Sequence, residues 1–173
     1  MLAPVDALDE LRALAAHAEN RRTETGLPRV AMVQGRVPEH RLTAVYEPMI
    51  NLILQGRKTM TIGEHTLRYD PATYFVLSVD LPAVGTVHQG SAGKPYLAVS
   101  LTLEPRIIAE VLETSPPCTG QAAGFAVAAV TPELLDAWVR LMRLSHRKFK
   151  RKVAVTPAPL AQPAIKTIAK ASS

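Results

Sequence analysis

The chain has 173 residues, of which 47% are hydrophobic, and it carries a single cysteine, Cys118. This length suits one domain with a tail, one cysteine excludes an internal disulfide, and no window holds the roughly 20 apolar residues of a membrane-spanning helix. The first 20 residues carry acidic side chains where a secretory signal would have a basic flank, so we expect a cytoplasmic protein.

Charge is distributed unevenly along the chain. The formal net charge is +5, but no Asp or Glu follows Asp136, whereas nine of the 20 basic residues do. Residues 1–136 therefore hold 11 basic and 15 acidic residues, a net charge of −4. The body of the protein is mildly acidic and its C-terminal segment is basic.

Residues 5–22 have the spacing of an amphipathic helix. The apolar positions that recur at helical spacing are Val5, Leu8, Leu11, Ala15 and Ala18. Pro4 precedes this segment, and Gly26 and Pro28 follow it as stop signals. We expect a unit of helix and linker over residues 1–27, with the helix packed on the body of the domain.

Residues 28–104 consist of short apolar runs separated by Gly, Pro, Asn or Asp. The clearest alternation sets Leu97, Val99, Leu101 and Leu103 against Ala98, Ser100 and Thr102. It predicts a strand with one buried face and one lighter face. Gly63 and Asp70-Pro71 stand where tight turns are needed. Many short antiparallel strands predict a β-sandwich or a small β-barrel with flanking helices.

Two helices are predicted within residues 105–145. The first begins at Pro105 and carries an apolar stripe that should lie on the barrel, formed by Ile107, Ile108, Val111 and Leu112. The second has Thr131 as its cap and Pro132 in its first turn. Its apolar surface is wide enough to pack against the rest of the chain or to join two subunits, and the sequence favours these two alternatives equally. The candidate residues for a homodimer interface are Leu134, Leu135, Trp138, Leu141 and Met142.

Several short motifs follow one another along residues 5–144. They are Tyr46-Glu47-Pro48, Leu54-Gln55-Gly56-Arg57-Lys58, Gly63, Tyr69, Val79-Asp80-Leu81-Pro82, Pro95-Tyr96-Leu97, Thr131-Pro132-Glu133-Leu134-Leu135 and Arg140-Leu141. In this order they resemble the N-terminal domain of AraC-type bacterial transcriptional regulators. The resemblance implies a cupin-like antiparallel β-barrel or jelly roll that binds a small effector and pairs subunits through helices. It also implies a C-terminal domain with two helix-turn-helix motifs that reads DNA.

The chain departs from this pattern after Leu144. Residues 146–173 have poor periodicity, three prolines and no acidic residue, so we expect a disordered or non-native basic tail and no DNA-binding domain. A frameshift or early stop is our hypothesis, with a natural truncation or a cloned terminus as alternatives. The basic run 147–152 could add weak, salt-sensitive affinity for nucleic acid to a fragment that otherwise acts only by pairing.

The sequence gives no support for catalysis. Its histidines are scattered one per segment, at His17, His40, His65, His88 and His146. No His-x-His pair occurs, so we predict neither a metal site nor a cofactor. Cys118 has no histidine near it and is predicted to be an ordinary loop thiol. A cupin-like metal-dependent enzyme remains the alternative function, and stoichiometric metal in the purified protein would favour it.

A pocket in the barrel would take its specificity from a few inward polar or aromatic side chains. The candidates for ligand binding are Tyr46, Gln55, Tyr74, His88 and Tyr96. His88 is the best single candidate, and each of the five has a structural role as its alternative. The pair Arg57-Lys58 is predicted to be a solvated strand end, with contact to an anionic effector as the minority alternative.

Overall fold

The computed structural model describes residues 3–19, 22–36, 39–71, 73–113 and 124–155. The helices in this part are α1 (Pro4–Ala15), α2 (Pro105–Glu113) and α3 (Pro132–Val155), with a short 3-10 turn at Ser91–Gly93. The strands are β1 (Arg22–Glu24), β2 (Val30–Gly35), β3 (Glu39–Tyr46), β4 (Met49–Gln55), β5 (Arg57–Ile62), β6 (His65–Tyr69), β7 (Thr73–Leu77), β8 (Leu81–His88), β9 (Tyr96–Thr102) and β10 (Phe125–Ala129).

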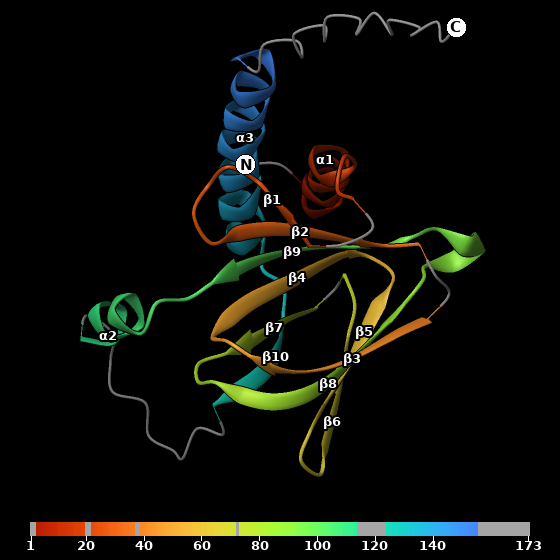
Figure 1. Cartoon of the computed structure of the whole chain (residues 1–173), viewed down its shortest axis with the longest axis vertical. Coiled ribbons are helices and arrows are strands. Elements are labelled where there is room, and N and C mark those ends of the chain that lie inside the picture. Colours follow the sequence, from red (N-terminus) through yellow and green to blue (C-terminus); the bar gives the residue numbers. More distant parts are fainter. Residues whose placement is uncertain (1–2, 20–21, 37–38, 72, 114–123, 156–173) are drawn as a thin grey trace, which may run out of the picture.

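The strands form two antiparallel sheets that face each other (Figure 1). The larger sheet has the order β1-β2-β9-β4-β7-β10, and the smaller has the order β3-β8-β5-β6. The chain crosses between the sheets so that β2-β9-β4-β7 lies opposite β3-β8-β5-β6, which is the strand order of a jelly roll. The predicted cupin-like jelly roll with flanking helices is therefore confirmed. Gly63, at a φ of 57°, makes the tight turn between β5 and β6.

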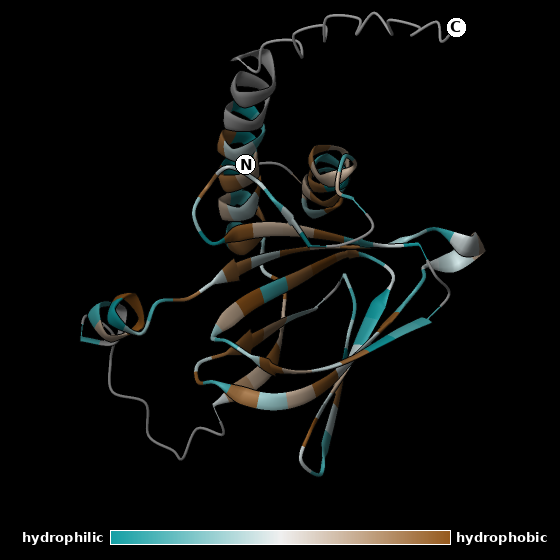
Figure 2. Ribbon diagram, in the orientation of Figure 1, coloured by the Kyte–Doolittle hydropathy of each residue, from teal (hydrophilic) through white to brown (hydrophobic). Residues whose placement is uncertain are grey.

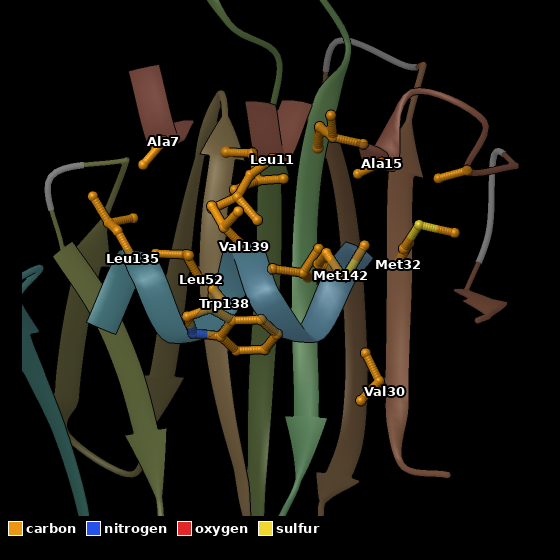
Figure 3. Close-up of a cluster of buried hydrophobic side chains, with 14 residues drawn as sticks. Ala7, Leu11, Ala15, Val30, Met32, Leu52, Leu135, Trp138, Val139 and Met142 are labelled. Carbon is orange, nitrogen blue, oxygen red and sulfur yellow. The ribbon is translucent and has the colours of Figure 1, made fainter. Parts of the chain in front are cut away.

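Both α1 and α3 cover the outer face of the larger sheet, and both are amphipathic (Figures 1 and 2). Leu11 of α1 and Trp138 of α3 are 0% and 3% exposed, and they pack with Leu52 and other apolar residues of β2, β4 and β9 (Figure 3). Arg143 of α3 makes a two-point ion pair with Glu10 of α1, with N–O distances of 2.6 and 2.8 Å. The prediction that the N-terminal helix packs on the body is confirmed.

The second apolar cluster lies between the sheets. It includes Ile53, Met60, Phe75 and Ala98, and the rings of Tyr69 and Phe75 stack with their centroids 5.4 Å apart. Both faces of β9 are therefore buried, one under the helices and one inside the jelly roll. The expectation of one buried and one lighter face was wrong, because the helices cover what would otherwise be the solvent side of the larger sheet.

The region after the barrel differs from the sequence prediction in three ways. A strand, β10, lies between the two helices and pairs with β7. The helix α2 stands beside the sandwich (Figure 1), and Ile108 is the only one of its described side chains that is even partly buried, so the prediction that it lies on the barrel was wrong. The helix α3 continues to Val155, past the predicted boundary at residue 145.

The start of α3 agrees with its predicted capping. The Leu134 backbone N–H donates to Thr131 Oγ1 at 3.2 Å, and Pro132 is the first helical residue. The residues predicted for dimerisation face the protein's own sheet: Leu135, Trp138 and Met142 are buried there, and Leu134 and Leu141 pack partly against the same cluster. Within the described residues, no helix is long and apolar enough to cross a lipid bilayer.

Candidate ligand-binding cavity

A cavity of about 670 Å³ lies between the two sheets. None of its lining residues comes from β6, β7 or β10, where the interior apolar cluster fills the space. Its walls combine apolar side chains with a few polar ones, as is usual for small-molecule sites of about 300–1,000 Å³. The apolar lining includes Val33, Leu42, Val45, Met49 and Val87. The polar lining includes Gln34, Asn51, Lys58, Ser100 and Thr102.

Lys58 projects into this cavity because of the alternation along β5. Met60 and Ile62 are buried, and residues at the same parity of a strand share a face, so Lys58 points inward while Arg57 is exposed. The solvated strand end predicted from the sequence is therefore correct for Arg57 and wrong for Lys58. Lys58 is half-buried, and the surface it retains faces the cavity.

Gly85 makes the room that Lys58 occupies. It pairs across the sheet with Met60 of β5 and Leu42 of β3. A Cβ at position 85 would lie 3.1 Å from Lys58 Cε and would collide with the Tyr46 hydroxyl. The missing side chain thus lets Lys58 and Tyr46 cross the inner surface of β8.

The ammonium group of Lys58 lacks an anionic partner in the described part of the chain. Its Nζ lies 5.1 Å from the centroid of the Tyr46 ring, which is the one interaction found for this group among the described residues. Burial lowers the pKa of Lys58 to about 8, because removal from water disfavours the charged form. The cavity therefore contains a partly desolvated cation whose one partner among the described residues is an aromatic ring.

Two tyrosines that line the cavity, Tyr46 and Tyr96, remain neutral near pH 7. Burial raises the pKa of Tyr46, and a hydrogen bond with the Gly85 backbone partly opposes that change. Burial also raises the pKa of Tyr96 far above its ordinary value, and this side chain is 2% exposed. Neither phenol can supply the negative charge that Lys58 lacks near neutral pH.

The larger sheet contributes two buried polar side chains that sit side by side, Asn51 on β4 and Ser100 on β9. The Tyr69 hydroxyl donates to Asn51 Oδ1 at 3.1 Å, and Asn51 Nδ2 donates to the Val99 carbonyl at 3.4 Å. Ser100 is 4% exposed, and its Oγ has no hydrogen-bond partner among the described residues. Ser100 lines the cavity, but its Oγ is itself buried and exposes almost no surface to it.

The structure brings two of the five predicted ligand-binding residues together. Tyr46 and Tyr96 both line the cavity. Tyr74 packs on the opposite face of the larger sheet with the cluster beneath the helices. Gln55 donates from Nε2 to the Pro95 carbonyl at 2.7 Å, and His88 Nδ1 lies 3.4 Å from Glu39 Oε2 at the sheet end. A ligand-binding role for any of the five stays a prediction.

Sequence reasoning missed Asn51 and Ser100 as members of this site, and it considered Lys58 only as a minority alternative, in contact with an anionic effector. The alternation Lys58-Met60-Ile62 is a signal that could have placed the lysine inside, since a charged residue in phase with two apolar ones is unusual on a buried face. Gln55 does not line this cavity. It borders a separate surface depression of about 540 Å³, which is lined largely by exposed and charged residues such as Asp9, Arg57 and Lys94.

The histidines remain apart, except that the rings of His17 and His146 lie 5.6 Å from each other beside the helices. Among the residues with assigned structure, no group of three His, Cys, Asp or Glu side chains could hold a metal ion. Cys118 lies outside the described residues.

Residues 26–158 match the family model described as the N-terminus of AraC-type transcriptional regulators. The chain belongs to this family. The match begins just before β2 and passes the end of α3, so this AraC-type domain continues beyond Leu144, where the sequence resemblance was expected to end. A comparison with curated proteins found no significant match.

Solved structures with a similar arrangement include two regulators and a cupin. Apo ToxT K231A from Vibrio cholerae has a TM-score of 0.47 and 8% identity, covering 75% of this chain and 54% of its own. The AraC-like activator CuxR has a TM-score of 0.44 and 16% identity, covering 82% and 57%. A cupin superfamily protein from Desulfitobacterium hafniense has a TM-score of 0.35 and 16% identity, covering 44% and 69%. The AraC-type domain spans little more than half the length of the two regulators.

Proposed function

We propose that this AraC-type domain senses a small-molecule effector, which binds in the cavity between the two sheets. The observation that carries the proposal is a space of about 670 Å³ with apolar walls, in which Lys58 has no anionic partner and the Ser100 hydroxyl no hydrogen-bond partner among the described residues. Buried polar groups without partners are costly in a folded protein, and a bound ligand would supply the missing partners.

The arrangement of the larger sheet provides a route from the cavity to the helices. Val33 and Ser100 line the cavity, whereas Met32 and Val99, their neighbours along β2 and β9, lie in the cluster beneath the helices. A ligand that orders these strands would therefore favour one packing of α1 and α3. An effector can shift such an equilibrium only by its difference in affinity for the two arrangements.

In this proposal the domain forms a homodimer through α3, and DNA is contacted by a separate domain of the regulator. Since the residues predicted for pairing are already packed on the sheet, the pairing surface would have to use the other side of α3, which exposes Arg140 and Leu144. A regulator of transcription acts on the chromosome, and we place this domain in the bacterial cytoplasm. Analytical ultracentrifugation over a concentration series tests the dimer.

Thermal unfolding in the presence of a metabolite panel tests the effector role. A ligand that binds only the native state raises the Tm in a concentration-dependent manner. Val87→Trp should abolish that rise, because the indole would fill the cavity that Val87 lines. Thr66→Ala, at an exposed position of β6, is the matched control and should keep the rise. A ligand that stabilises the Val87→Trp variant as much as the wild type would place its binding site elsewhere.

A further inference from the structure

The position of Lys58 restricts the chemical class of the effector. Removing an ammonium group even partly from water is costly unless the group gains a partner, and here the ring of Tyr46 is its single described partner. The other titratable or charged groups that line or border the cavity are Arg22, His40, Tyr46, Glu47, Tyr69 and Tyr96. Glu47 is exposed, and no ion pair joins it to Lys58.

The charge of the site indicates a monoanion. One lysine balances one negative charge, whereas a phosphate dianion would keep an uncompensated charge among apolar walls. The remaining cationic group, Arg22, is exposed, and its Nε lies 3.3 Å from Glu24 Oε1. A carboxylate satisfies this balance and accepts charge-assisted hydrogen bonds from an ammonium group.

The two sheets separate the polar groups of the cavity. Lys58 belongs to the smaller sheet, and the unpartnered Ser100 hydroxyl belongs to the larger one. Around these groups the cavity offers an apolar surface for the body of a ligand. The side chains available to contact such a body are apolar and include Val33, Met49 and Val87.

We propose that the effector is an organic monocarboxylate, held by an ion pair between its carboxylate and Lys58 Nζ, with an apolar body that lies against Val33, Met49 and Val87. This inference rests on the proposed effector role of the cavity and narrows it to one ligand class. The depressed pKa of Lys58 is consistent with a site that is completed by an anion, since an anionic ligand would restore the charged form.

Titration calorimetry with matched acids and alcohols tests the proposal on the whole chain. The probe pairs are octanoate and octanol, phenylbutyrate and phenylbutanol, and naphthoate and naphthylmethanol. At pH 7 at least one acid should bind more than about tenfold more tightly than its alcohol. Lys58→Met, which keeps an unbranched side chain one atom shorter and removes the charge, should remove this preference and leave alcohol affinity unchanged or higher. Arg57→Met, on the exposed face of the same strand, should leave both affinities unchanged.

The pH dependence gives a second readout. Acid affinity should fall severalfold between pH 7 and pH 9.5 as Lys58 loses its proton, while alcohol affinity stays constant. Burial raises the pKa of Tyr46, Tyr69 and Tyr96, so these phenols remain neutral over that range.

The outcomes separate this inference from the broader function. If acids and alcohols bind equally, or if Lys58→Met leaves acid binding intact, the carboxylate proposal is wrong while an effector cavity stands. If none of the acids binds but neutral metabolites stabilise the wild type and not Val87→Trp, the same conclusion holds. If nothing binds in the cavity, both proposals fail.

Discussion

Replacing Lys58 with methionine should stabilise the ligand-free protein. Lysine and methionine have similar length, but methionine carries no charge that must be removed from water. Burial lowers the pKa of Lys58 from 10.5 to about 8, which corresponds to a penalty of about 3 kcal/mol on the charged form. The ring of Tyr46 returns part of a cation's lost hydration, about 0.5–2 kcal/mol, so Lys58→Met should gain about 1–3 kcal/mol at pH 7.

The gain should depend on pH with a defined sign. Because the folded-state pKa of Lys58 is depressed, the unfolded chain binds more protons than the native protein between pH 8 and pH 10.5. The wild type therefore gains stability from this residue as pH rises through that window and loses it as pH falls through about 8. The advantage of the variant should be about 2 kcal/mol smaller at pH 9.5 than at pH 7.

Urea unfolding followed by tryptophan fluorescence measures this difference, since Trp138 is buried in the helix-covered cluster. Wild type, Lys58→Met and the exposed control Arg57→Met would be compared at pH 7 and pH 9.5. A wild type that is as stable as Lys58→Met at pH 7 would refute the reasoning, because it would mean that the buried ammonium group is already compensated without a ligand. If Lys58→Met is more stable than the wild type but binds no carboxylate, Lys58 lowers the stability of the wild type and is needed for carboxylate binding.

Three further substitutions probe the fold and the cavity. Trp138→Ala should lower the free energy of unfolding by about 3–5 kcal/mol in urea titrations, because it empties a site that is 3% exposed. Tyr69→Phe removes the hydroxyl that donates to Asn51 Oδ1 and should lose about 1–2 kcal/mol by scanning calorimetry; an unchanged Tm would show that water replaces the bond. Ser100→Ala deletes a buried hydroxyl that has no partner among the described residues, and it should leave the ligand-free protein equally or slightly more stable, whereas a loss above about 1 kcal/mol would reveal an existing partner.

Local patterns in the sequence were sufficient for the fold class. Short apolar runs with Gly63 and Asp70-Pro71 at their turns predicted antiparallel strands, and Thr131 with Pro132 predicted the start of α3. These signals depend on backbone preferences and on contacts between near neighbours in the chain, so they can be recognised without knowledge of the tertiary structure. The ordered motifs predicted the AraC-type family, which the match over residues 26–158 confirmed.

The candidate site was predicted only in part, since Tyr46 and Tyr96 line the cavity and Gln55, Tyr74 and His88 do not. A tyrosine in an apolar strand has the same local signature whether it faces the cavity or the helices. Tyr74 was misplaced for this reason: both faces of the larger sheet are covered, so burial alone does not distinguish them.

The sequence by itself determined the strands, the turns, the cap of α3 and the family. The tertiary structure decided that Lys58 is a cavity residue. Lys58 is on the inward-facing side of β5, the absence of a side chain at Gly85 on the paired strand β8 leaves room for it, and the ring of Tyr46 lies beside its ammonium group. These groups come from β5, β8 and β3, and only the pairing of those strands brings them together. Desolvation of a charge depends on everything that surrounds it, so no local pattern could reveal it.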